Sequence, residues 1–138
     1  MERRFETKIA VALRDDLLPW QSLNVTAFLT SGIAAAAPEV VGEPYEDADG
    51  TPYLAMIGQP VVVLQGSLEQ LRTAHTKAVD RGHAIAVYTH DMFTTDHDEA
   101  NRAAVRAVAR ADLDLVGIAV HGPRNGVDKV TKGLALHP

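Results

Sequence analysis

The chain has 138 residues, of which 46% are hydrophobic and 22% charged, and it contains no cysteine. This composition predicts one globular domain spanning residues 1–138 and excludes disulfides, thiolate metal sites and a cysteine nucleophile. The formal net charge of −5 disfavours a nucleic-acid partner, because the summed field repels polyphosphate. No apolar run approaches the roughly 20 residues that a membrane span needs, and residues 1–6 lack the pattern of a signal peptide. We therefore expect a cytoplasmic protein with no membrane partner.

The first half of the chain predicts a strand, a helix and a loop. Residues 8–14 alternate large apolar residues with alanine, as expected of a strand that helices cover on both faces. Residues 17–37 are almost entirely apolar and stop before a proline, which predicts a buried helix. Residues 43–50 have the composition of a loop. Residues 53–57 and 61–65 then predict a hairpin or a bent strand.

The second half alternates between helix and strand patterns. Residues 67–82 predict a helix with a serine cap and a glycine stop, and His75 lies on its apolar stripe, as a hydrogen-bonded core histidine would. Residues 84–89 predict a strand, residues 96–111 a helix and residues 113–120 a buried strand. This order implies parallel neighbours joined by right-handed crossovers. The expected fold class is a three-layer α/β fold whose small, mixed, mostly parallel sheet carries helices on both faces.

The densest polar cluster, residues 89–99, follows a predicted strand, at the sheet edge where open α/β folds bind their ligands. Thr95 or Asp96 is suited to cap the helix that follows. His90 and Asp91 lie too far upstream for capping, which makes them the candidates for binding or acid–base catalysis, with solvated loop residues an equal alternative. The cluster lacks the spacing of a metal site, so we expect no metal.

Further polar residues extend this candidate site. We expect Asn24, Thr94, Asn101 and His121 to contribute to ligand binding or substrate orientation. His121 ends the last long strand and borders the same predicted sheet edge as His90. No Walker-type loop and no Gly-x-Gly-x-x-Gly motif occurs, so we expect no nucleotide cofactor.

Arginines recur every four residues on the predicted helix 96–111, at Arg102, Arg106 and Arg110. Such a row can contact phosphate. A solvated face is the favoured interpretation, because Asp98 precedes Arg102 by four residues, the order that favours a helical ion pair.

The closing segment, residues 122–136, predicts a turn, a two-turn helix and a last strand. Its Gly-Pro start and its Val-Asp-Lys-Val-Thr-Lys-Gly-Leu-Ala-Leu run resemble the chain end of the archaeal and eukaryotic type of peptidyl-tRNA hydrolase. Arg14-Asp15-Asp16-Leu17 is likewise similar to the end of that family's first strand. The resemblance implies the α/β fold of that hydrolase superfamily.

The same resemblance implies altered chemistry. A lysine and a histidine at the start of the family's first helix are thought to contribute to its active site, and neither is found in residues 22–31. His90 or Asp91 stands where the family has an aspartate that is a candidate catalytic residue, and the helix 96–111 replaces a short loop. Losing the lysine removes the cation that would hold a phosphate or polarise an ester carbonyl. We therefore expect that peptidyl-tRNA hydrolysis has been lost.

The whole chain is also similar to a family of domains of unknown function, numbered 2000 in domain classifications. The similar segments include the Gly-x-Pro-Tyr run ending at Tyr45, the Asp-x-Phe-x-Thr run at residues 91–95, Asn101-Arg102 and residues 127–134. This resemblance implies a fold and no established activity.

The favoured function is the binding of a small or peptide-like ligand at the sheet edge. One alternative is a hydrolase in which Asp91 or His90 acts as base and Thr94 or Asn24 orients the substrate. Another is a structural dimer without catalysis. We expect a homo-oligomer, because the apolar first helix exceeds what one domain can cover.

Overall fold

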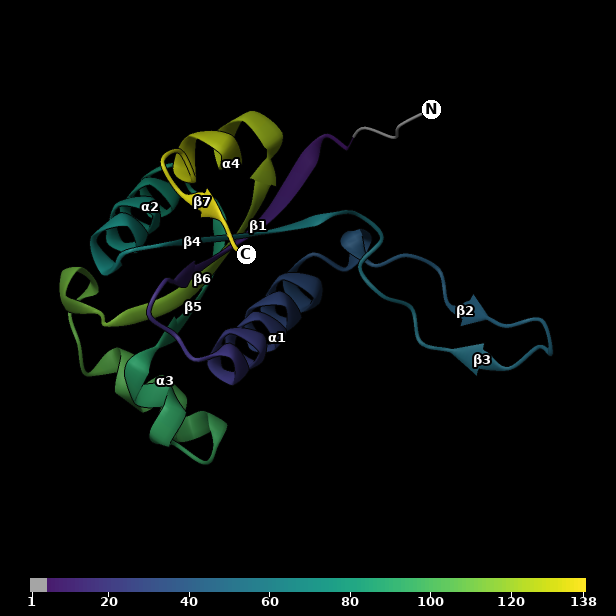
Figure 1. Ribbon diagram of the computed structural model, residues 1–138, viewed down its shortest axis with the longest axis horizontal. Coiled ribbons are helices and arrows are strands. Elements are labelled where there is room, and N and C mark those ends of the chain that lie inside the picture. The colour runs from purple at the N-terminus through teal and green to yellow at the C-terminus, as the bar shows by residue number, and fades with distance from the viewer. Residues whose placement is uncertain (1–4) are drawn as a thin grey trace.

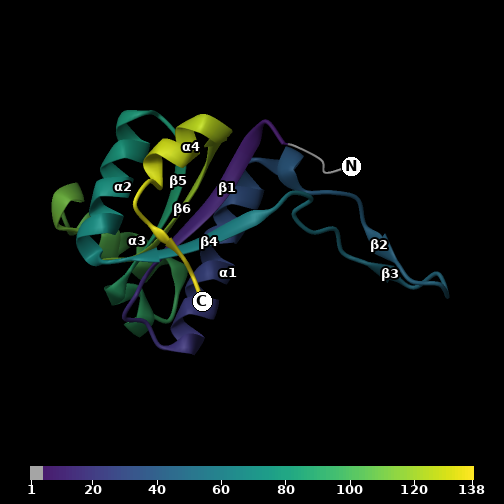
Figure 2. The ribbon, with the colours of Figure 1, turned by 45° about the horizontal axis from the view of Figure 1, so that its top comes forward.

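A five-stranded mixed sheet forms the centre of the computed structural model, which describes residues 5–138 (Figures 1 and 2). Its strand order is β5 (Ala84–Thr89), β6 (Leu115–Pro123), β1 (Thr7–Arg14), β4 (Val61–Gly66) and β7 (Ala135–Leu136). Helices cover both faces, which confirms the three-layer α/β class. Only β1 and β4 pair in parallel, so the expectation of a mostly parallel sheet is wrong.

The sheet is not mostly parallel because of the way the chain connects β5 to β6. The segment that joins them stays at one end of the sheet, so the chain re-enters beside β5 in the opposite direction, and the two strands pair antiparallel. Within the described part of the chain, no helix combines the length and the hydropathy of a membrane span. The expectation about a signal peptide falls mainly on residues 1–4, which lie outside the described residues.

Helix α1 (Pro19–Ala36) covers one face of the sheet. Its buried side chains Val25, Leu29 and Ile33 pack with the odd-numbered residues of β1. Gly117 on β6 makes this contact close, since a Cβ there would lie 2.6 Å from Val25 Cγ1. The expectation of a buried helix holds for this face alone, because large apolar side chains on the rest of α1 are exposed, namely Trp20 at 56%, Leu23 at 74% and Phe28 at 57%.

Helices α2 (Leu68–Asp80) and α4 (Arg124–Val130) cover the opposite face. The predicted cap of α2 is confirmed: Ser67 Oγ accepts the amide of Gln70 at 3.2 Å, and Gln70 Oε1 accepts the amide of Ser67 at 2.9 Å. Gly82, with φ of 71°, follows the end of the helix as expected. The two-turn helix and last strand predicted for residues 122–136 are confirmed as α4 and β7.

Two 3-10 turns and a short helix connect β5 to β6: His90–Thr94, α3 (Asp98–Arg106) and Arg110–Asp112. The cap of α3 is His97, whose Nδ1 accepts the amide of Ala100 at 3.1 Å, and neither Thr95 nor Asp96. The helix is shorter than the predicted 96–111. The chain leaves helical geometry at Ala109, and this brings Leu113 into the core beneath α2, so tertiary packing overrides the alanine-rich pattern.

A hairpin arm, residues 42–60, projects from the body of the molecule (Figures 1 and 2). It contains β2 (Tyr45–Glu46) and β3 (Pro52–Tyr53), which pair antiparallel. Asp47 closes the turn by accepting the amides of Asp49 and Thr51, each at 3.0 Å, and the Tyr53 hydroxyl at 2.7 Å. Residues 53–57 and 61–65 form neither the hairpin nor the bent strand predicted for them, because β3 pairs with β2 and β4 joins the central sheet beside β1.

Candidate functional site

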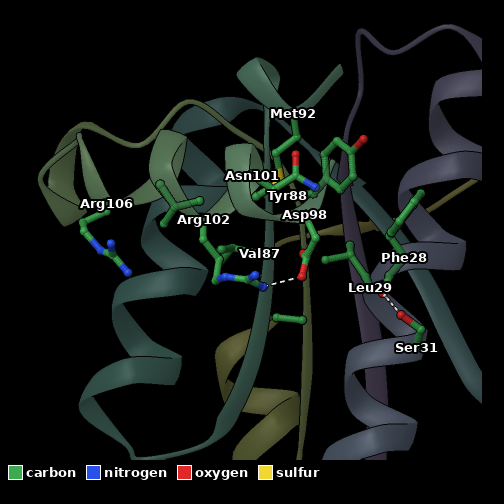
Figure 3. A pocket seen from close by; sticks show the side chains of 12 residues that line it. Phe28, Leu29, Ser31, Val87, Tyr88, Met92, Asp98, Asn101, Arg102 and Arg106 are labelled. Carbon is green, nitrogen blue, oxygen red and sulfur yellow. Dashed lines mark hydrogen bonds and ion pairs between the residues drawn. The ribbon is translucent and has the colours of Figure 1, made fainter. Parts of the chain in front are cut away.

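An open groove runs along the free edge of β5, between α1 and α3 (Figure 3). It has a volume of about 600 Å³, and a second hollow of about 610 Å³ shares many of its lining residues and extends toward the start of α1. We call the two together the β5 groove. β5 pairs only with β6, so the backbone groups on its other side face no strand within the described residues. The groove therefore combines side-chain walls with an unpaired strand edge.

Aromatic side chains form one wall of the β5 groove. The ring centroids of Trp20 and Phe93 are 5.8 Å apart, those of Phe93 and Tyr88 5.3 Å, and those of Tyr88 and Phe28 5.9 Å. The chain has only one Trp, three Tyr and three Phe, so four of its seven aromatic residues gather here. More than half of the Trp20 and Phe28 side chains remains exposed. This wall can stack against an apolar or aromatic ligand.

Neutral polar groups lie beside the aromatic wall. Burial raises the pKa of the Tyr88 hydroxyl, and a side-chain hydrogen bond with Asn24 offsets part of this rise. The hydroxyl of Thr95 contacts the side-chain amide of Asn101 and lies 3.0 Å from the carbonyl oxygen of Met92. These amide and hydroxyl groups can donate to and accept from an uncharged polar ligand.

An ion pair and a further arginine, Arg106, line the α3 side of the groove. Figure 3 shows Arg102 forming an ion pair with Asp98 on the α3 side, while Phe28 and Ser31 face the groove from α1. This pair confirms the contact predicted from the spacing of Asp98 and Arg102. Since Asp98 offsets the charge of Arg102, this pair by itself does not favour a strongly charged ligand.

The predicted site residues fall into two groups. Asn24 and Asn101 line the β5 groove. Thr94, His90 and Asp91 do not line it and are exposed on the preceding 3-10 turn. There the Thr94 hydroxyl donates to the Asp91 carbonyl oxygen at 2.9 Å, and the His90 ring packs edge-on against Phe93 at a centroid distance of 5.8 Å. In this conformation the catalytic candidates stand beside the groove and not inside it.

His121 lies far from this site. On β6, His121 pairs with Ala84 and Leu115 pairs with Thr89, so His121 and His90 lie at opposite ends of the β5–β6 pair. The expectation that both border one sheet edge is wrong, because it assumed parallel strands. His121 Nε2 is buried and has no hydrogen-bond partner among residues 5–138.

A charged cluster of Arg14, Asp16 and Asp114, which was not predicted from the sequence, lies at the carboxyl end of β1. Arg14 Nε donates to Asp16 Oδ1 at 2.9 Å, and its Nη1 donates to Asp114 Oδ1 at 2.6 Å. The hydrogen bond from Arg14 lowers the pKa of Asp16. The amide of His90 also donates to the Asp114 carbonyl oxygen at 2.9 Å. These contacts connect β1 to the 3-10 turn beside the groove. The single arginine of the cluster is bound by two carboxylates.

No group of three or more histidine, aspartate or glutamate side chains converges as metal ligands would in the part of the chain that the structure describes. The residues that sequence reasoning missed are the aromatic ones, because they come from three separate segments. Aromatic residues are rare in this chain, and this rarity was the feature of the sequence that could have pointed to them as functional residues.

Comparison with known proteins gives a family without an assigned activity. The family model described as "Protein of unknown function (DUF2000)" matches residues 7–138. A solved structure of a protein of unknown function from Agrobacterium tumefaciens strain C58 is 46% identical, with a TM-score of 0.95, over 98% of this chain and 100% of that one. No curated protein matches the chain. The chain therefore belongs to the DUF2000 family.

Proposed function

We propose that this protein binds a small or peptide-like ligand in the β5 groove and is a non-hydrolytic relative of the archaeal and eukaryotic type of peptidyl-tRNA hydrolase. The observation that carries the proposal is the partly exposed aromatic wall beside the unpaired edge of β5. Exposed aromatic rings in a concave site favour ligand binding, since covering them removes apolar area from water.

A peptide-like ligand fits the groove for two reasons. An extended main chain can hydrogen-bond to a strand edge and so add a strand to the sheet. Residues 86–88 of β5 line the groove and provide that edge. The amides of Asn24 and Asn101 offer further hydrogen bonds beside the rings that would receive the ligand's side chains.

Loss of hydrolysis agrees with the charges near the groove. The lysine of the hydrolase family is missing from residues 22–31. Arg14, which stands at the carboxyl end of β1, is held by Asp16 and Asp114 and so is not free to bind a phosphate or an oxyanion. His90 and Asp91 do not line the groove. We expect no turnover of peptidyl-tRNA; turnover that Asp91→Ala abolishes would establish the hydrolase alternative instead.

Trp20 is the only tryptophan of the chain, so its fluorescence reports directly on the groove. The probe is a library of capped peptides of about three to five residues, sorted by aromatic, aliphatic and charged side chains. We expect saturable changes in Trp20 emission with the uncharged aromatic members. A library in which no member gives a saturable change would contradict the peptide-like assignment.

Phe28→Ala tests the aromatic wall. Burying such a ring contributes about 1.5–3 kcal/mol, and because 57% of Phe28 is exposed, a ligand would cover roughly half of this. The variant should therefore bind about fivefold more weakly. Tyr45→Ala is the matched control, since Tyr45 is 50% exposed but lies on the hairpin arm. Equal weakening in both variants would place the ligand elsewhere.

Self-association is a second proposal, and exposed apolar side chains of the hairpin arm support it. Leu54 and Met56 are 87% and 60% exposed, on a hairpin whose strands have two residues each. So short a hairpin is marginal in water by itself, and contact with a second copy would cover its apolar residues.

Sedimentation velocity measures this directly. We expect a concentration-dependent dimer that Leu54→Ser with Met56→Ser converts to monomer, while peptide binding at the groove persists. A wild-type protein that stays monomeric at high concentration would exclude the structural dimer and leave the groove proposal intact.

A further inference from the structure

A second concave site lies on the other side of the sheet, between α2 and the 3-10 turn Arg110–Asp112, which Figure 1 shows beside α2. This α2 cleft has a volume of about 550 Å³. Its lining residues are Arg72, Thr73, His75, Thr76, Lys77, Arg110 and Ala111. No residue lines both the α2 cleft and the β5 groove, so the two sites are independent.

The lining of the α2 cleft is cationic. It contains two arginines and one lysine and no carboxylate, in a chain whose net charge is −5. Among residues 5–138, neither Lys77 nor Arg110 has an ion-pair partner. Arg72 has one long ion-pair contact, 3.4 Å to Glu69, whose side chain is 83% exposed, and its Nε and Nη2 donate to the Leu113 carbonyl oxygen at 3.4 and 3.3 Å. Such a pair contributes little, so the positive charge of the cleft is largely uncompensated.

His75 adds an unused polar group at the base of the cleft. With 6% of the residue exposed it is nearly buried, and its side chain has no hydrogen-bond partner within the described residues. The predicted core histidine is thus buried as expected but is not hydrogen-bonded. Its ring nitrogens are not among the fully buried side-chain atoms that lack a partner, so water can reach them. A ligand in the cleft would replace this water as the hydrogen-bond partner.

We propose that the α2 cleft binds the phosphate group of a small phosphorylated molecule. A guanidinium group matches phosphate oxygens with paired charge-assisted hydrogen bonds, which Arg110 can supply, and Arg72, whose Nε and Nη2 donate to the Leu113 carbonyl oxygen, adds its positive charge from the opposite wall. Lys77 adds a third charge, and the Thr76 hydroxyl and the His75 ring add neutral contacts. The volume of about 550 Å³ exceeds that of a phosphate ion, which leaves room for an organic part.

NMR titration of the full chain tests this proposal through the ring resonances of His75. Inorganic phosphate is added at constant ionic strength, with chloride as the replaced ion. We expect a saturable shift of the His75 resonances and a smaller or absent shift with acetate, because a carboxylate offers fewer oxygens to the three cations. A shift that grows linearly without saturation, or that chloride reproduces, would overturn the proposal.

Arg110→Ala and Lys77→Ala locate the site. Each should weaken phosphate binding about tenfold or more, since each removes a charge-assisted hydrogen bond. Arg106→Ala is the matched control, because Arg106 is an exposed arginine of α3 that does not line the α2 cleft. Equal weakening by Arg106→Ala would show a diffuse charge effect and refute a defined site.

Titration with glycerol 3-phosphate and with glycerol shows whether the cleft binds a phosphate ester or only free inorganic phosphate. Saturable binding of the ester but not of glycerol supports a small phosphorylated ligand, and binding of inorganic phosphate alone refutes that part of the proposal. Transfer RNA is the third probe. If it binds with a steep salt dependence and displaces phosphate, the cleft is a nucleic-acid site and the proposal is wrong.

Discussion

The close packing of α1 on β6 determines where the aromatic wall stands, and Gly117→Ala tests this packing. A Cβ at Gly117 would lie 2.6 Å from Val25 Cγ1 and 3.0 Å from Leu29 Cδ1. Carbon atoms prefer separations of about 3.5–4.0 Å, so the helix would have to move by roughly 1 Å. Overpacking of this kind costs about 1–3 kcal/mol, and replacing a strand glycine by alanine returns roughly 0.5–1 kcal/mol.

The expected net loss is about 1–2 kcal/mol of unfolding free energy, or roughly 4–8 °C in Tm for a chain of this length. Thermal unfolding followed by circular dichroism measures it. Gly32→Ala is the matched control, because its Cβ would meet Ala86 Cβ at 3.5 Å, an ordinary contact, and alanine favours the helix. This variant should be stabilised by roughly 0.5–1 kcal/mol. If Gly117→Ala is as stable as Gly32→Ala, α1 does not lie on β6 as described.

A double variant sharpens the test. Val25→Ala removes the atom nearest to the new Cβ, although it leaves a smaller core side chain. The combination with Gly117→Ala should therefore be less destabilised than the sum of the two single variants by more than about 0.5 kcal/mol. Simple additivity would contradict the clash as the cause.

Burial and, secondarily, Arg110 lower the pKa of His75 below its ordinary value of 6.5, so the unfolded chain binds more protons there and stability should fall as pH drops below about 6.5. Urea unfolding at several pH values should show this fall lessened in His75→Gln, and an unchanged pH profile would contradict it. Arg14→Leu should raise the pKa of Asp16 toward its ordinary value of 3.8, as followed by carboxyl NMR; an unmoved titration would mean that the cluster does not form in solution. Ser67→Ala removes the cap of α2 and should cost about 1 kcal/mol in chemical denaturation, whereas Thr73→Ala on the same helix should cost less than about 0.5 kcal/mol; equal costs would refute the cap.

Elements with local signals were predictable from the sequence. The cap at Ser67, the glycine after α2 and the residues of β5 depend on neighbours a few positions away, and all three agree with the structure. The direction of β6 was not predictable in the same way. It depends on whether the segment from His90 to Asp112 crosses the face of the sheet or stays at its end, which no local pattern encodes.

The candidate site was predictable in part. Asn24 and Asn101 line the groove, and their role in binding stays a prediction, whereas His121 was misplaced together with the direction of its strand. The aromatic wall was missed because Trp20 is distant in sequence from Tyr88 and Phe93 and meets them only after folding. An apolar helix that shields one side of a small sheet must leave other apolar residues exposed, and this is the physical reason why Trp20 and Phe28 remain available for a ligand.

Amide hydrogen exchange along β5 tests the central claim most directly. The exchange of residues 86–88 is measured in the free protein and in the presence of the tightest capped peptide from the fluorescence screen. The account predicts that the amides on the open edge of β5 are protected when the peptide binds, because they then donate to its main chain. A peptide that changes Trp20 emission but leaves these amides unprotected, and protects the hairpin arm instead, would contradict the account.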